Sequence, residues 1–144
     1  MKLPLTILLA TAGAVALSAA VPREQAPVNA NAETYIQVAQ DAAALRSEGQ
    51  PLYAKECGGC HGANGQGGDG PKLAGNDFVK AAGAVISQIL VGMTEHGMPP
   101  FADVLNDRQI AAITTYVTAT WGQVTAATTP DMVRTMRGGA AGGM

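Results

Sequence analysis

The short sequence Cys57-Gly58-Gly59-Cys60-His61 constrains this chain more than any other feature. It holds both cysteines of the chain and one of its two histidines. A C-x-x-C-H sequence is the attachment signature of c-type haem, in which two thiols add to the two vinyl groups of one haem and the following imidazole lies below the iron. The motif therefore predicts a single covalent haem c, bonded to Cys57 and Cys60, with His61 as an axial ligand.

Three other sites could use the same cysteines. A thioredoxin-like redox pair would follow a β-strand in a βαβ unit, and the sequence shows neither. A zinc site would have to combine the motif with His96, but His61 directly follows Cys60 and no H-x(3-5)-H pair exists. A structural disulfide is usual for paired cysteines in an oxidising compartment, but it needs no adjacent histidine. Covalent haem attachment is therefore the favoured interpretation.

A second candidate ligand lies in the segment His96-Gly97-Met98-Pro99-Pro100-Phe101. Proline fixes φ and cannot continue a helix, so the two prolines predict an extended loop that holds the Met98 sulfur over a haem face. A thioether opposite histidine raises the reduction potential of the iron. The predicted metal ligands are therefore His61 and Met98. His96 is the next alternative and would give an iron of lower potential, whereas Met93 ends an apolar run and is expected to pack against the haem or the core.

Three further residues are candidates for contact with the haem or its ligands. A ligating histidine usually donates its other ring N–H to an acceptor. The carbonyl of Pro71, which follows a glycine-rich segment, is a candidate for this bond, although an ordinary turn fits these residues equally well. Tyr116 and Trp121 are equally compatible with core packing and with contact to the haem edge or propionates.

Helical patterns without strand pairs predict an all-α fold. Apolar residues recur at helical spacing from Phe78 to Leu90, after a helix cap at Asn76 or Asp77. Asn106, followed by Gln109, predicts a capping box before the last long helix. Aromatic residues make up only 4% of the chain, so a buried haem would supply apolar volume that the side chains lack. The apolar stripe of the last long helix consists of Ile110, Ile113, Tyr116, Val117 and Trp121.

The haem domain is expected to span residues 49–122. Its first helix is predicted to begin at Gly49 or the next residue, with Pro51 near its first position, where proline is tolerated. Residues 21–48 before it are expected to form a linker with an extension helix. Residues 123–144 after it are expected to form a tail with a short helix.

The N-terminus is typical of an exported protein. Residues 1–20 combine a positively charged start, an apolar run and small residues, of which Ser18 and Ala20 fit cleavage after Ala20. A retained membrane anchor is the alternative, because the apolar stretch approaches the length of a spanning helix. The expected location is the periplasm, with or without an N-terminal anchor.

Together these segments resemble class I c-type cytochromes with one haem ligated by His and Met. The resemblance covers about half of the chain, from Gly49 to Trp121. It rests on the haem motif, on Gly70-Pro71-Lys72-Leu73, on the loop that carries Met98 and on the final helix with its Trp-Gly ending.

The resemblance implies the small cytochrome c fold, in which helices pack round one covalently attached haem. The first and last helices of such domains cross beside the haem, and Gly49 and Tyr53 would meet Tyr116 at this crossing. The resemblance also implies that the Pro71 carbonyl bonds to His61.

An electron carrier, rather than an enzyme, is the expected function. With His61 and Met98 on the iron, no axial position remains for a substrate. The extra sequence at both ends, and a Trp-Gly ending that is similar to cytochromes serving periplasmic dehydrogenases, favour a subunit or dedicated partner of a periplasmic oxidoreductase or respiratory complex. A freely diffusing shuttle is the alternative. A haem sensor or peroxidase-like protein would need a labile or absent Met98 bond.

The charge of the chain bears on its partners. The formal net charge is -2 and no Lys/Arg cluster exists, so nucleic acid is not an expected partner. The expected partners are redox proteins, namely a periplasmic dehydrogenase, a terminal oxidase or both. Lys55, Lys72 and Lys80 lie near the haem segments but alternate with acidic residues, so docking is expected to use an apolar edge at residues 99–101.

Overall fold

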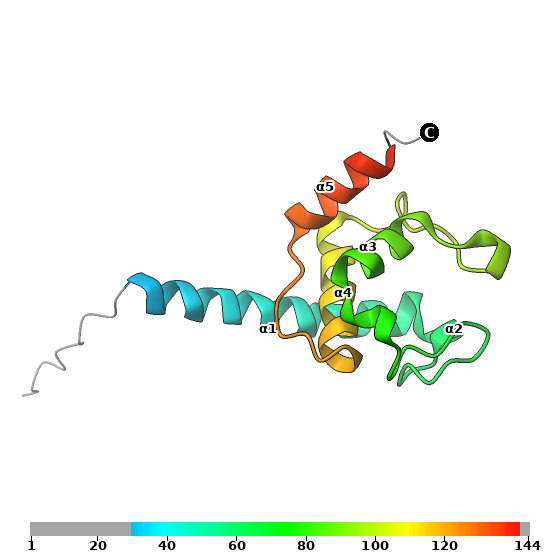
Figure 1. Cartoon of the computed structure of the whole chain (residues 1–144), viewed down its shortest axis with the longest axis horizontal. Helices are drawn as coiled ribbons and strands as arrows, with labels where there is room; N and C mark the ends of the chain where they lie inside the picture. Colours follow the sequence, from blue (N-terminus) through cyan, green and yellow to red (C-terminus); the bar gives the residue numbers. More distant parts are fainter. Residues whose placement is uncertain (1–29, 142–144) are drawn as a thin grey trace, which may run out of the picture.

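The computed structural model describes residues 30–141, and all regular secondary structure in this range is helical (Figure 1). An isolated antiparallel bridge joins Met93 to Met98, and the described range contains no β-strand. The predicted all-α fold is therefore confirmed. The helices are α1 (Ala30–Glu56), α2 (Gly58–His61), η1 (Asp77–Lys80), α3 (Ala82–Val91), η2 (Thr94–His96), α4 (Asp107–Trp121) and α5 (Pro130–Ala141).

The predicted export signal at residues 1–20 lies outside the described residues, and so does the first part of the expected linker, as far as residue 29. Between residues 30 and 141, none of the helices combines the length and the apolar character that a membrane span requires.

A single continuous helix, α1, occupies the region where the sequence predicted an extension helix and a separate domain helix. It runs through Pro51, so the predicted helix start at Gly49 or the next residue is wrong. An internal proline removes one backbone hydrogen bond and costs about 3 kcal/mol or more. Leu45 and Tyr53, on either side of the proline, are both buried. Burial of these two side chains therefore offsets the cost of Pro51, which by itself favours a helix boundary.

The helices α1 and α4 cross at Gly49 (Figure 1). A Cβ atom at Gly49 would lie 2.0 Å from the carbonyl oxygen of Ala112 and 2.8 Å from the Cβ of Tyr116. One turn later, the ring of Tyr53 lies 5.5 Å from the ring of Tyr116. Gly49 and Tyr53 thus meet Tyr116, as the resemblance implies, and the absence of a side chain at Gly49 allows the two backbones to approach.

The apolar run from Phe78 to Leu90 forms two elements instead of one helix. Asn76 is the predicted cap, and its side-chain oxygen accepts a hydrogen bond from the Phe78 N–H at 3.0 Å. The first turn is the 3-10 helix η1, and Ala81 then takes an extended conformation before α3 begins. The residues of α3 that enter the core are Val85, Ile86, Ile89 and Leu90.

The predicted capping box at the start of α4 is present. The Asn106 side chain accepts a hydrogen bond from the Gln109 N–H at 2.9 Å, and the Gln109 side chain accepts one from the Asn106 N–H at 2.9 Å. These two bonds satisfy backbone donors that a helix start leaves unpaired. The helix that follows is the most buried one in the fold, and its inward residues include Ile110, Ala111, Ile113 and Val117.

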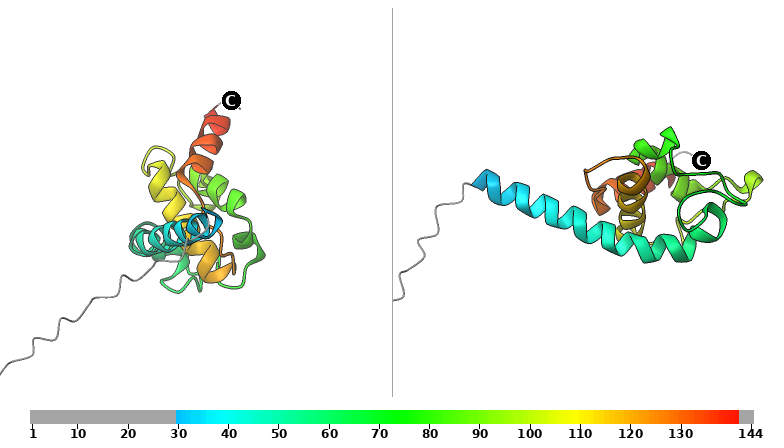
Figure 2. Two further views of the ribbon diagram at one scale, coloured as in Figure 1. Left: turned by 90° about the vertical axis from the view of Figure 1, so that its left-hand side faces the viewer. Right: turned by 90° about the horizontal axis from the view of Figure 1, so that it is seen from below.

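The first half of α1 extends beyond the other helices, as Figure 2 shows. Tyr35 is 76% exposed, and Ile36 and Val38 are more than half exposed. This half of α1 therefore presents apolar side chains that the rest of the described chain does not cover.

The crossing at Gly49 can be tested with one alanine substitution. Gly49→Ala places a methyl group against the backbone of α4, so we expect the free energy of unfolding to fall by about 1–3 kcal/mol. Denaturant unfolding of the haem-loaded protein, followed by circular dichroism, measures this change.

Gly83→Ala is the matched control, because Gly83 is also helical and a Cβ there would meet nothing within 4 Å. Its stability is expected to stay unchanged or to rise by up to about 1 kcal/mol. Equal stability of the two variants would contradict the close approach at the crossing.

Candidate haem site

The two cysteines and the histidine of the motif lie on one helical turn directly after α1. The backbone N–H groups of Cys60 and His61 both donate to the Cys57 carbonyl, at 3.2 and 2.9 Å. The two cysteines form no disulfide; Cys57 is half-buried and Cys60 is exposed. Two free thiols on one turn are the arrangement that addition to the vinyl groups of one haem requires.

The surroundings of Cys57 suit a neutral sulfur. Burial raises the pKa of the Cys57 thiol to about 12, and the neighbouring Glu56 carboxylate and Cys60 contribute to the same shift. A thioether carries no charge and is therefore compatible with this partly buried position.

The imidazole of His61 is oriented by the loop that follows it. Its Nδ1 lies 2.8 Å from the Pro71 carbonyl oxygen, the contact that the resemblance implies. A carbonyl only accepts, so Nδ1 carries a proton, and in the neutral ring Nε2 then has a free lone pair. A Cβ at Gly70 would lie 3.0 Å from the imidazole, so the loop passes directly against the ring. One ring nitrogen is thus held in place and the other is available to a metal.

Tyr53, Tyr116 and Trp121 form an aromatic cluster next to this loop. The ring centroids lie 5.1 to 5.7 Å apart. The Tyr53 hydroxyl donates to the Gly62 carbonyl at 2.7 Å, and a Cβ at Gly65 would lie 2.8 Å from the Trp121 ring. The cluster therefore connects α1 and α4 to the glycine-rich loop. Contact of Tyr116 or Trp121 with a haem edge stays a prediction.

The loop that carries Met98 contacts Gly92 and Met93, the two residues that directly follow α3. The backbone of Met98 pairs with that of Met93 through two hydrogen bonds, at 2.8 and 3.1 Å. Gly92 has φ of 71°, and a Cβ there would lie only 2.7 Å from the Met98 carbonyl oxygen. Met98 itself is half-buried, whereas His96 and Met93 are exposed. Met93 was expected to pack against the haem or the core; it does not pack in the core, and its contact with the haem stays a prediction.

Gln88 contacts the candidate ligand Met98, although no sequence pattern singled it out. Its side-chain N–H group donates to the Met98 sulfur at 3.6 Å. A hydrogen bond to a ligating atom changes its electron donation and thereby tunes the metal. The available sequence signal is weak: Ser87 and Gln88 interrupt the apolar run of α3 with two polar residues.

The donor set fits a c-type haem: two free thiols, one oriented imidazole and one thioether sulfur in a constrained loop. Residues 44–117, slightly more than half of the chain, match the protein family described as cytochrome c oxidase, cbb3-type, subunit III. The chain belongs to this family. The predicted membership in the class I c-type cytochromes is thereby confirmed. Neither a curated protein nor a solved structure matches the chain.

The cytochrome c domain makes this protein an electron carrier with haem c as its cofactor and redox proteins as its partners. When bound, the haem iron alternates between the ferric and ferrous states and so holds the transferred electron. The matched range includes both the haem motif and the Met98 loop. The chain itself supplies the orientation of the imidazole through the Pro71 carbonyl and the constrained loop that carries the thioether.

Substitution of Tyr53 by Phe tests the bond between α1 and the motif loop. Burial raises the pKa of Tyr53 from the ordinary value of 10.0 to about 12. The hydroxyl therefore contributes stability below pH 10, and this contribution is lost between pH 10 and 12 as the unfolded chain ionises first. We expect Tyr53→Phe to lower the free energy of unfolding by about 1 kcal/mol at neutral pH. The difference from the unsubstituted protein should shrink above pH 10.

Denaturant unfolding of the haem-loaded protein at a series of pH values measures this difference. Tyr35→Phe is the control, because Tyr35 is 76% exposed and its loss of a hydroxyl should change stability at no pH. A Tyr53→Phe difference that stays constant from pH 7 to pH 12 would show that the hydroxyl is not held as described.

Proposed function

We propose that this cytochrome transfers single electrons as the electron-accepting subunit or dedicated partner of a periplasmic oxidoreductase or respiratory complex. The observation that carries the proposal is the family match, which spans both the haem motif and the Met98 loop. The haem domain is proposed to occupy residues 49–122, which overlap the matched range.

One haem c is proposed to be bonded to Cys57 and Cys60 and coordinated by His61 and Met98. The Pro71 carbonyl supports this assignment, because its bond to Nδ1 leaves Nε2 of His61 free for iron. The Gln88 amide supports Met98, since it engages the sulfur of that residue. Tyr116 and Trp121 are proposed to contact the haem from the aromatic cluster. With both axial positions filled, no site for a substrate remains on the iron.

The first half of α1 supports a lasting association with a larger protein. Its apolar residues Tyr35, Ile36 and Val38 are mostly exposed, and exposed apolar side chains on one helix favour contact with a partner. A freely diffusing shuttle would leave this half of α1 uncovered. Cytochrome c domains are usually exported, and we propose the periplasm as the location, with residues 1–20 as a cleaved signal or a retained anchor.

The surface near the Met98 loop supports docking through apolar contacts. Val91 and Val104 are more than half exposed, and Pro99 and Pro100 are exposed between them in sequence. Two of the three lysines that lie near the haem segments in sequence are paired with acidic neighbours, since Lys55 contacts Glu56 at 2.6 Å and Lys80 contacts Asp77 at 2.7 Å. Little positive charge is therefore left to attract an acidic partner.

Substitution of the proposed sixth ligand tests the assignment of the site. Met98→Ala is expected to remove the red charge-transfer band of ferric His/Met iron and to lower the reduction potential, because a thioether stabilises the ferrous state. Optical spectra and a redox titration measure both changes, and the mass of the purified protein shows whether one haem is covalently attached. Met93→Ala is the control and is expected to retain the band.

Three results would contradict the assignment. High-spin iron in the unsubstituted protein would favour a sensor or peroxidase-like function. Loss of the band in His96→Ala, with Met98→Ala unaffected, would move the sixth ligand to His96. A mature chain without the added mass of haem, produced in a host with haem-maturation machinery, would remove the basis of the proposal.

Ionic strength tests the apolar docking surface. Electrostatically steered association changes by about 10- to 1,000-fold with charge screening. We expect the rate of electron transfer to the co-purifying partner to change by less than about tenfold between low and high salt. Stopped-flow oxidation of the reduced cytochrome measures this rate, and a steeper decrease would indicate docking through charged groups.

A further inference from the structure

The C-terminal helix α5 lies outside the range that matches the family, yet it is an integral part of the fold. Val133 is fully buried and Met136 is partly buried against the core. The helix expected in the C-terminal tail runs from Pro130 to Ala141. Because α5 packs on the core, it can support neighbouring segments of the fold.

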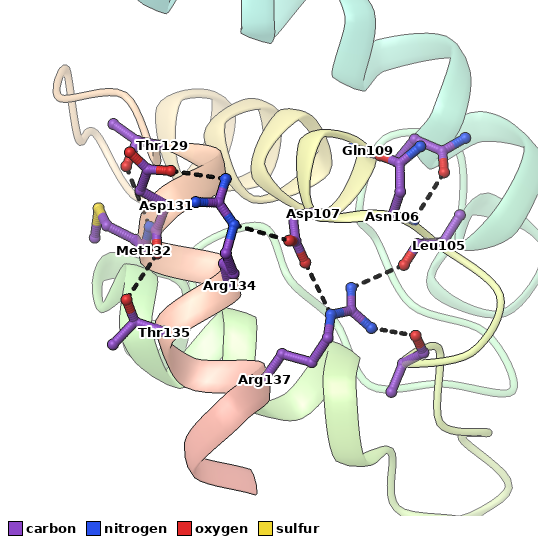
Figure 3. Close-up of polar contacts among 11 residues, drawn as sticks. Leu105, Asn106, Asp107, Gln109, Thr129, Asp131, Met132, Arg134, Thr135 and Arg137 are labelled. Carbon is purple, nitrogen blue, oxygen red and sulfur yellow. Dashed lines mark hydrogen bonds and ion pairs between the residues drawn. The ribbon is translucent and has the colours of Figure 1, made fainter. Parts of the chain in front are cut away.

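The guanidinium of Arg137 joins α5 to three separate acceptors (Figure 3). Its Nε donates to the Asp107 carboxylate at 2.8 Å, and its Nη2 donates to the Leu105 carbonyl at 2.9 Å. Its Nη1 donates to the Ala102 carbonyl. The Arg137 side chain is 29% exposed, so these bonds are partly shielded from water.

Two of these acceptors belong to the connector, which we define as residues 99–106 between Met98 and α4. The start of the connector is bound to α3, because the Phe101 N–H donates to the Ile89 carbonyl at 2.9 Å. The rest of the connector forms a turn closed by a bond within the connector itself, in which the Leu105 N–H donates to the Phe101 carbonyl at 2.9 Å. Arg137 supplies the attachment of this turn to α5, and Asp107 fixes the guanidinium at the start of α4.

We propose that Arg137 is a positioning residue for the Met98 ligand, which it serves by clamping the connector through the Ala102 and Leu105 carbonyls. The inference rests on the proposed function, in which Met98 coordinates the iron. A planar guanidinium can bond several acceptors at once, and hydrogen bonds from a charged donor are stronger than neutral ones. Without the clamp, the connector keeps its bonds to α3 at Phe101 and to α4 at Asn106, but its middle turn loses both bonds to α5 and Met98 leaves the iron more readily.

Arg134 provides a matched control on the same helix. Its side chain is 67% exposed and contacts Asp131 at 2.8 Å and Asp107 at 3.7 Å (Figure 3). Arg134→Ala therefore removes the same charge, from the same helix and near the same carboxylate, without removing a bond to the connector. Exposed ion pairs of this kind contribute little to stability.

The test uses the full-length haem-loaded protein and the competition between imidazole and Met98 for ferric iron. Arg137→Ala is expected to raise the affinity for imidazole about tenfold, which corresponds to about 1.4 kcal/mol, and to weaken the red charge-transfer band. Arg134→Ala is expected to stay close to the unsubstituted protein in both measurements. Circular dichroism during heating reports the unfolding of the helices separately from the loss of the Met98 bond.

If the alanine variant does not fold, Arg137→Lys provides the same test. Lysine retains the charge beside Asp107 but lacks the planar fork needed to bond both carbonyls as well. It is also expected to bind imidazole more tightly than the unsubstituted protein does.

The inference is overturned if the Arg137 variants bind imidazole as weakly as Arg134→Ala does. It is also overturned if these variants lose thermal stability while their affinity for imidazole stays unchanged. That result, with the red band intact in the unsubstituted protein, leaves the proposed function standing. Absence of the band from the unsubstituted protein removes the proposed function itself.

Discussion

The contact between α1 and α4 at Gly49 is the constraint on which the rest of the structure depends. Since no side chain separates the two backbones there, Tyr53 of α1 lies against Tyr116 of α4. The Tyr53 hydroxyl then bonds the loop directly after the haem motif, and Trp121 at the end of α4 packs on the same loop. The crossing therefore determines where the motif and its oriented imidazole lie relative to the core.

The two proposed iron ligands are held by different kinds of structure. His61 lies on a short helical turn and is oriented by a backbone carbonyl ten residues later. Met98 lies in a loop whose restraints come from several elements: the pairing with Met93, the Gln88 amide, and the connector that Arg137 bonds from α5. A site that is supported in this way can keep its ligands in place while the charge of the iron changes.

The two ends of the described chain also differ in their physical character. The first half of α1 extends away from the other helices and exposes apolar side chains, which suits contact with another protein. In contrast, α5 buries Val133 and bonds the connector through Arg137, so it acts within the cytochrome itself. Extra sequence at the two ends therefore does not serve one common purpose.

The sequence alone determined those features that depend on residues close together in the chain. The haem motif, the Asn106 cap with Gln109 and the candidate ligand Met98 could all be located in this way, because their chemistry is set by spacings of a few residues. The Asn76 cap belongs to the same group, although the conformation of Ala81 divided the helix expected to follow it.

Only the tertiary structure decided that α1 passes through Pro51, because burial of neighbouring side chains outweighs the local preference for a helix start. It also brought Gln88 against the Met98 sulfur and Arg137 against the connector. The bond from Arg137 to Ala102 joins residues 35 positions apart. Such pairs carry no local signal, since they meet only when the helices have packed against one another.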